Sequence, residues 1–217
     1  MDELIRNLAV YALPVLFAIT MHNAAQAYAA KYFGDMTPVA AGRVTTNPLA
    51  HIDPFGTVIL PVIMYLATHF VFGYAKPLPI DYSRLRNPKR DMAFVALAGT
   101  AAHFGMALLW LLMGMFLEYF GVSEPFPNKV AQAGVLTNLF LLAFNLLPIP
   151  PMDGGRVVFA LLPNKLAYKY ARIEPYGFFI LLGLMLLHLL AYWVIPVVAV
   201  AQLLLQLIVS PLNLLLT

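Results

Sequence analysis

The chain has 217 residues, of which 62% are hydrophobic and only 11% are charged, whereas soluble domains carry about 25% charged residues. This composition excludes an ordinary soluble protein and predicts an integral membrane protein that contacts the lipid bilayer. The formal net charge of +3 is modest and gathers near the ends of apolar segments, so it indicates no nucleic-acid partner. The lack of cysteine excludes disulfides and thiolate metal ligands.

Five apolar segments follow one another along the chain, and a helix that crosses a bilayer needs about 20 such residues. The segments that we expect to be helical lie at about 4–33, 57–72, 92–117, 130–152 and 176–216. The second is short and contains Pro61, which favours a re-entrant segment over a full crossing. The last is divided by Pro196, so that it forms one span or two spans joined by a tight turn.

These segments predict an all-α polytopic membrane protein with about five to six transmembrane or re-entrant helices. We expect residues 1–217 to form a single integral membrane domain, because no soluble domain or linker interrupts them. The stretch 35–56 is polar and rich in proline, glycine and threonine, so it predicts a short extended loop or hairpin after the first span.

Lysine and arginine are unevenly distributed between the loops. The loops 74–91 and 156–175 are basic and are expected to be cytoplasmic, whereas the sparse loop between the third and fourth segments is expected outside. If the second segment is re-entrant, His22 and the turn around Asp153 share one membrane depth. If it crosses fully, they lie at opposite surfaces, and its short length favours the first arrangement.

Polar side chains that can bind a metal or move a proton are costly within membrane segments and mark function by default. The candidates are His22, His103, Asn145 and Asp153. At 1.5 Å per residue, His22 lies roughly 15 Å and His103 roughly 18 Å from the inner ends of their helices. Asp153 follows three prolines, and the irregular backbone that they leave must be buried in protein or line a wet cavity. A carboxylate on a broken helix, facing an imidazole, suits a divalent metal.

Four stretches, in this order, resemble the site-2 protease family of intramembrane zinc metallopeptidases. They are HNAAQAYAAKYFGD, GRVTTNPLAHIDPFGT, GYAKPLPIDYSRLRNPKRDMAFVALAG and FNLLPIPPMDGGR. The resemblance covers most of the chain and implies a three-helix core, here about 4–33, 92–117 and 130–152, with further spans around it. It also implies zinc as cofactor, a transmembrane protein or peptide as substrate, and a site near the cytoplasmic side of a bacterial inner membrane.

The resemblance also assigns roles to individual positions. In the family, an H-E-x-x-H helix supplies two zinc ligands and the general base, and a D-G-G turn supplies the third ligand. By that resemblance His22 and Asp153 are metal ligands, and Asn145 steadies the substrate or the oxyanion.

The chain departs from the family where the chemistry is done, in the segment His22-Asn23-Ala24-Ala25-Gln26. Asn23 stands at the position of the general base, and an amide cannot accept a proton at neutral pH. Gln26 stands at the position of the second histidine, and a neutral amide oxygen is a poor zinc ligand beside an imidazole.

A third departure lies in the stretch AGTAAH, where family members usually read A-G-P-x-x-N. Thr100 replaces the proline and His103 replaces the asparagine. The gained histidine could restore a metal site made of His22, His103 and Asp153, or it could be a buried interior histidine with no ligand role.

These features leave several functions open. The first is a site-2-protease-like homologue whose hydrolysis of peptide bonds is absent or very weak, that is, a pseudoprotease. The alternatives are a non-catalytic binder or scaffold of transmembrane helices that holds no metal, a metal site rebuilt with His103, and an inactivated variant of an active enzyme. The additional changes at Thr100 and His103 favour natural divergence over the last of these.

Overall fold

The structure of the chain is a computed structural model that describes residues 2–59, 63 and 76–216, and over those residues it contains helices and no strand. Its elements are α1 (Asp2–Phe33), α2 (Thr37–Ala40), η1 (Pro48–Ala50), η2 (Pro54–Ile59), η3 (Tyr82–Arg84), α4 (Pro88–Tyr119), α5 (Pro125–Asn145), α6 (Asp153–Leu161), α7 (Asn164–Ala171), η4 (Glu174–Tyr176), α8 (Gly177–Leu186) and α9 (Leu190–Leu216). Most of the segment predicted at 57–72 lies outside the described residues, so its re-entrant or crossing path stays a prediction.

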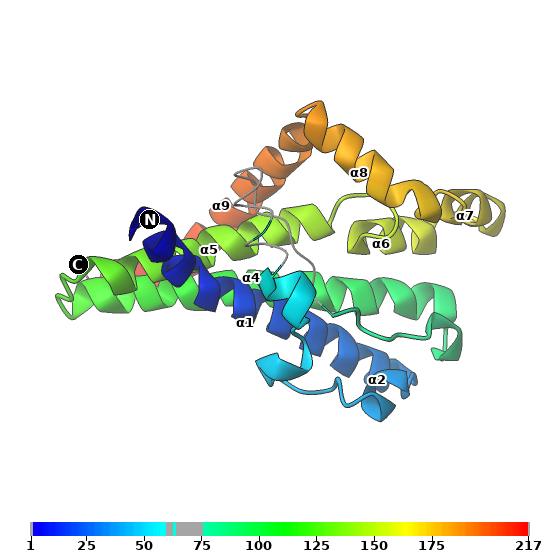
Figure 1. Cartoon of the computed structure of the whole chain (residues 1–217), viewed down its shortest axis with the longest axis horizontal. Coiled ribbons are helices and arrows are strands. Elements are labelled where there is room, and N and C mark those ends of the chain that lie inside the picture. The colour runs from blue at the N-terminus through cyan, green and yellow to red at the C-terminus, as the bar shows by residue number, and fades with distance from the viewer. Residues whose placement is uncertain (1, 60–62, 64–75, 217) are drawn as a thin grey trace.

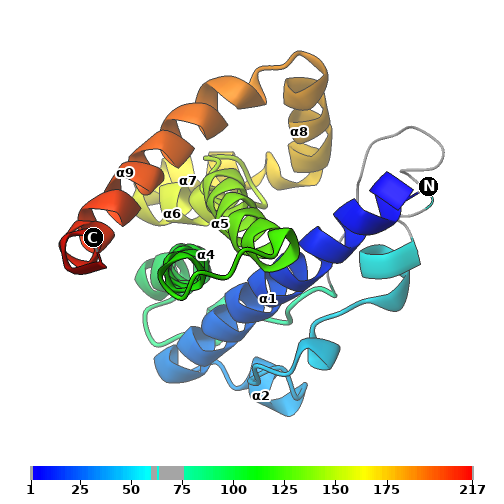
Figure 2. The ribbon, with the colours of Figure 1, turned by 90° about the vertical axis from the view of Figure 1, so that its left-hand side faces the viewer.

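Three long helices form the core: α4 packs against both α1 and α5, and α1 also contacts α5 (Figures 1 and 2). Val10 of α1, Trp110 of α4 and Ala133 of α5 meet in one buried apolar cluster. Gly134 leaves room for the indole, because a Cβ at this position would lie 2.2 Å from Trp110 Cγ. Small residues allow such close helix packing in a membrane. On the other side of α5, α9 adds Leu205 to a second cluster.

Prolines and a glycine set the ends of the core helices. Gly34 follows the last residue of α1 with a φ of 112°, a backbone conformation that favours glycine and ends the helix. Pro88 and Pro125 begin α4 and α5, where the fixed φ and the missing N–H of proline are well tolerated. The helix α5 ends at Asn145, before the three prolines, rather than continuing to 152.

Three helices in the described part of the chain are long and apolar enough to cross a membrane: Arg6–Phe33, Pro88–Tyr119 and Leu190–Leu212. The predicted all-α membrane fold is therefore confirmed. The stretch 35–56 forms a loop with short helical turns, so of the two forms left open by the sequence it is the loop and not the hairpin.

The apolar C-terminal stretch breaks at a different place from the one predicted. The helix α8 ends at Leu186, α9 begins at Leu190, and His188 between them has a φ of 56°. Pro196 lies inside α9, so the division predicted there is wrong. With ten residues, α8 is about 15 Å long and too short to cross a bilayer.

Both basic loops lie at the same end of the helical core. Lys89, in the first turn of α4, donates hydrogen bonds to the Leu162 carbonyl and, at 3.1 Å, to Asn164 Oδ1. The turn between α4 and α5 lies at the opposite end of the molecule (Figure 1). The two basic loops thus lie at one end of the core, and the loop with few lysines and arginines lies at the other end, as the sequence predicts.

Candidate active site

The candidate site lies where α1 and α4 approach each other closely. Gly99 of α4 faces α1, and a Cβ at this position would lie 2.6 Å from His22 Cε1 and 2.8 Å from Gln26 Cγ. Since those distances are shorter than any ordinary contact, only glycine permits the approach. His22 and Gln26 are four residues apart and share one face of α1. Both side chains are therefore directed toward α4.

Asp153 reaches the same point because the chain is broken after α5. The prolines that follow Leu147 cannot continue the helix, and a new helix, α6, begins at Asp153 itself. A Cβ on Gly154 would lie 2.1 Å from the Leu146 carbonyl oxygen. The first turn of α6 therefore packs directly on the backbone that follows the end of α5. The carboxylate of Asp153 is consequently held inside the protein, with the residue 3% exposed.

The carboxylate of Asp153 contacts both polar side chains of α1. His22 Nε2 lies 3.4 Å from Asp153 Oδ2, and Gln26 Nε2 donates a hydrogen bond of 2.8 Å to Asp153 Oδ1. Because carboxylate oxygens only accept hydrogen bonds, the Gln26 amide turns its NH₂ group, and not its oxygen, toward Asp153. Asp153 Oδ2 is buried and has no hydrogen-bond partner among the described residues, apart from its contact with His22.

Arg156 balances the charge of Asp153. Its Nη1 lies 3.2 Å from Asp153 Oδ1, and its guanidinium lies over the ring of Tyr82 in η3, 5.1 Å from the ring centre. Burial, offset in part by Arg156, raises the pKa of Tyr82 to about 12. Neither residue was predicted from the sequence, although Arg156 follows Asp153 at the helical spacing i,i+3 that indicates such a pair.

His103 lies beside His22, but its ring nitrogens are used by two asparagines. The two imidazoles stack with ring centres 4.8 Å apart and planes 28° apart. His103 Nδ1 lies 3.2 Å from Asn138 Oδ1, and His103 Nε2 lies 3.3 Å from Asn145 Nδ2. Asn138 Nδ2 donates in turn to the Gly134 carbonyl, at 2.9 Å. This series of hydrogen bonds fits a neutral His103 imidazole with its proton on Nδ1. The lone pair on Nε2 then accepts a hydrogen bond from Asn145.

The structure therefore brings together five of the six predicted site residues: His22, Gln26, His103, Asn145 and Asp153. The sixth, Asn23, lies next to His22 on α1 and is partly buried. Sequence reasoning missed Asn138, which precedes Asn145 by seven residues. That spacing places both asparagines on one face of α5 and was the available signal.

The donors in the described part of the chain do not fit the zinc centre that the family resemblance implies. Such a centre needs three protein donors at about 2.0–2.2 Å from one point. His22 Nε2 and Asp153 Oδ2 suit two corners of a tetrahedron, since donors around zinc lie about 3.3 Å apart and these are separated by 3.4 Å. Among the residues that the structure describes, the third donor is lacking, because Gln26 presents N–H groups and the His103 lone pair faces Asn145. Over the described ranges, no three His, Cys, Asp or Glu side chains form a group that could hold a metal ion.

Comparison with known proteins gives one consistent family. Residues 121–188 match the sequence profile described as Peptidase family M50. The chain is 33% identical over 189 residues to “Putative zinc metalloprotease YwhC” of Bacillus subtilis (strain 168), a match that covers 85% of this chain and 83% of the relative. It is 29% identical over 180 residues to “Putative zinc metalloprotease Rip2” of Mycolicibacterium smegmatis, covering 82% and 67% of the two chains.

A shorter match of 81 residues, 32% identical, links it to “Zinc metalloprotease MJ0392” of Methanocaldococcus jannaschii and covers 37% of this chain and 23% of the relative. No solved structure matches significantly. The extent of the first match, together with the apolar helices and the broken helix that carries Asp153, shows that the chain is an integral membrane protein belonging to the site-2 protease family, peptidase family M50.

Proposed function

We propose that this chain is a site-2 protease homologue in which peptide-bond hydrolysis is absent or very weak. The observation that carries the proposal is the 2.8 Å hydrogen bond from Gln26 Nε2 to Asp153 Oδ1. Together with Arg156, this bond partners Oδ1, one of the two oxygens of the buried Asp153 carboxylate. Gln26 of α1 and Arg156 of α6 thus stabilise this oxygen from two sides.

Hydrolysis also requires a group that takes a proton from the attacking water. Asn23 occupies the position of the family's glutamate, and its amide has no acid–base function near neutral pH. Losing a positioned base lowers a rate by roughly 10²–10⁴-fold. The acceptor nitrogen of His103 is occupied by Asn145, and His22 Nε2 faces Asp153, so neither imidazole is placed to replace the base.

A cleavage assay tests this proposal. The unaltered chain and its Asp153→Asn variant, reconstituted in lipid vesicles with zinc supplied, are each incubated with a model single-span substrate. We expect equal and near-background cleavage, because a chain without a working site has no activity for the substitution to remove. A cleavage rate in the unaltered chain that Asp153→Asn abolishes would overturn the proposal.

A groove beside the site favours a second candidate function, the binding of transmembrane segments without cleavage. The groove has a volume of about 370 Å³ and is lined by Leu97, Thr100, Ala101, Phe104, Leu142 and Leu146. It lies between α4 and α5 and is almost entirely apolar. A groove of this kind suits the side chains of an apolar helix in the bilayer.

Filling the groove is expected to weaken such binding. In vesicles, energy transfer from a labelled single-span peptide to the labelled chain should show about tenfold weaker association for Leu97→Trp or Ala101→Trp, because overpacking typically costs 1–3 kcal/mol. Leu109→Trp, on a strongly exposed face of α4, is the matched control and should change nothing. Equal binding by all of these variants would rule out the groove as the binding surface.

The position of the basic loops indicates which side of the membrane this end of the molecule faces. The loops that contain Lys89 and Asn164 contact each other at the end of the core where α6 and α7 lie (Figure 1). Because lysine and arginine concentrate on the cytoplasmic side of membrane proteins, we place this end of the chain at the cytoplasmic surface of a bacterial inner membrane.

A further inference from the structure

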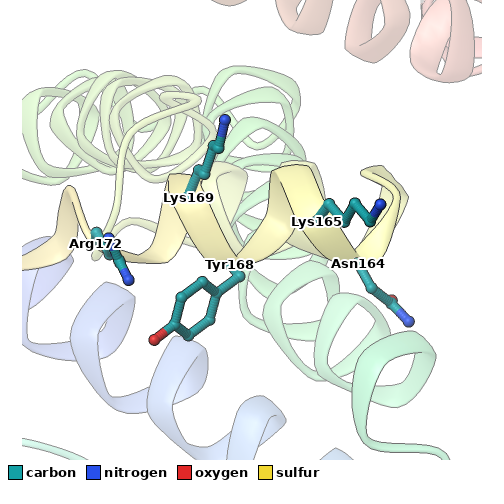
Figure 3. A pocket seen from close by; sticks show the side chains of 5 residues that line it. All are labelled: Asn164, Lys165, Tyr168, Lys169 and Arg172. Carbon is teal, nitrogen blue, oxygen red and sulfur yellow. The ribbon is translucent and has the colours of Figure 1, made fainter.

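The helix α7 presents a strongly cationic surface that plays no part in the site around Asp153. A shallow hollow of about 500 Å³ is lined by Asn164, Lys165, Tyr168, Lys169 and Arg172 (Figure 3). All five side chains project from α7 and the residue after it, with Lys169 directed to one side and Tyr168 to the other. No acidic residue occurs between 164 and 173. The hollow therefore has one sign of charge.

The cations on this surface are exposed and are not neutralised by the protein. Lys165, Lys169 and Arg172 are all exposed, and none of them forms an ion pair with a carboxylate in the described part of the chain. Arg172 instead lies over the ring of Tyr168, 4.7 Å from its centre. A stacked guanidinium keeps its N–H donors available at the ring's edge, where they can reach an anionic oxygen.

Contacts on the inner side of α7 fix its position relative to the membrane-crossing helices. Ala167 is buried, and Tyr170 donates a 2.9 Å hydrogen bond to the Pro148 carbonyl at the break after α5. Asn164 accepts from Lys89, in the first turn of the spanning helix α4. The helix therefore lies at the level where α4 enters the bilayer.

The segment that follows α7 is apolar enough to lie in the bilayer. The helix α8, GFFILLGLML, begins at Gly177 and contains no polar side chain. Phe178 and Phe179 are 56% and 67% exposed, which suits lipid and not water. With α8 in contact with lipid, the cationic hollow of the preceding helix would lie at the depth of the lipid headgroups, where tyrosine is also enriched.

We propose that the cationic face of α7 binds the phosphate groups of anionic phospholipids in the adjoining leaflet. Charge complementarity selects an anion, and the fixed position beside α4 and α8 selects one that belongs to the membrane surface. Lys165, Lys169 and Arg172 are spaced i, i+4 and i+7, so they follow one face of the helix and can contact neighbouring headgroups together.

Lipid binding by the full-length chain tests the proposal. The detergent-purified protein is titrated with short-chain phosphatidylglycerol or phosphatidylcholine, and bound lipid is counted by native mass spectrometry. A triple variant with glutamine at Lys165, Lys169 and Arg172 is expected to bind phosphatidylglycerol roughly 100-fold more weakly, since each basic residue near an anionic surface contributes about fivefold. Binding of phosphatidylcholine should not change.

Matched variants separate the surface from net charge and from misfolding. Replacing Lys31, Lys76 and Lys129, which are exposed elsewhere, by glutamine removes the same charge and should leave binding unchanged. The pair Lys165→Arg and Lys169→Arg keeps the charge and should keep the binding.

Three results would overturn the proposal. One is equal loss of binding in both triple variants, which would mean unspecific attraction. Another is equal binding of phosphatidylcholine and phosphatidylglycerol. The third is displacement of the lipid by inorganic phosphate at equal concentration, which would make the free ion the ligand.

Discussion

The double variant Asn23→Glu, Gln26→His is expected to bind about one zinc ion per chain under conditions in which the unaltered chain binds almost none. Gln26 lies four residues after His22 on the same helical face and already contacts Asp153. A histidine there replaces an N–H donor by a lone pair, next to His22 Nε2 and to Asp153 Oδ2, which has no hydrogen-bond partner among the described residues. The three donors that a zinc peptidase needs are then present.

Zinc titration of the purified variant, followed by metal analysis after dialysis, measures this gain. The same double variant carrying Asp153→Ala is the control and should lose the metal, because two imidazoles alone hold zinc weakly. If the double variant binds no zinc although its circular dichroism equals that of the unaltered chain, the remaining donors are not arranged as a zinc site, and our account of His22 and Asp153 fails.

Replacing Arg156 by methionine is expected to destabilise the fold by about 2–3 kcal/mol. Removing one partner of a fully buried ion pair typically costs about 3–5 kcal/mol, because the other charge is left without a partner. Asp153 is almost fully buried, but the Arg156 side chain is 31% exposed, and solvent screening reduces the loss. Reversible denaturation in detergent micelles, followed by circular dichroism, gives the difference in free energy of unfolding.

Two further variants identify the cause of that loss. Adding Asp153→Asn to Arg156→Met removes the unpaired charge and should recover most of the stability. Arg84→Met breaks the pair between two exposed side chains, Arg84 and Asp81, and should cost much less stability than Arg156→Met, because solvent screens that pair. If Arg156→Met is no more harmful than Arg84→Met, then Arg156 does not balance the buried carboxylate.

The sequence was sufficient to predict the helical membrane fold, and the short second segment together with the family resemblance favoured the proximity of His22 to Asp153. Long apolar segments allow few structures in a bilayer, and the prolines before Asp153 predict a broken helix. The break in the C-terminal stretch was misplaced at Pro196, because a proline in the early turns of a membrane helix can be tolerated. The actual break at His188 carries no comparable signal in the sequence.

The detailed contacts of the site could not be predicted from residue types alone. A histidine in place of an asparagine at position 103 suggested a new metal ligand, a hypothesis that remains open to experiment. In the structure its nitrogens face Asn138 and Asn145, and those contacts depend on how α4 and α5 are rotated against each other. Spacing along one helix does not determine that rotation. Arg156 was likewise visible in the sequence, but its pairing with Asp153 follows from the direction of α6.

We propose that the amide of Gln26, and not a metal ion, partners Asp153 Oδ1 in the unaltered protein. The metal content of the purified chain, produced with ample zinc and isolated without chelators, tests this claim most directly. We predict zinc far below one ion per chain and no change on Asp153→Ala. One tightly bound zinc per chain, lost in both His22→Ala and Asp153→Ala, would contradict it.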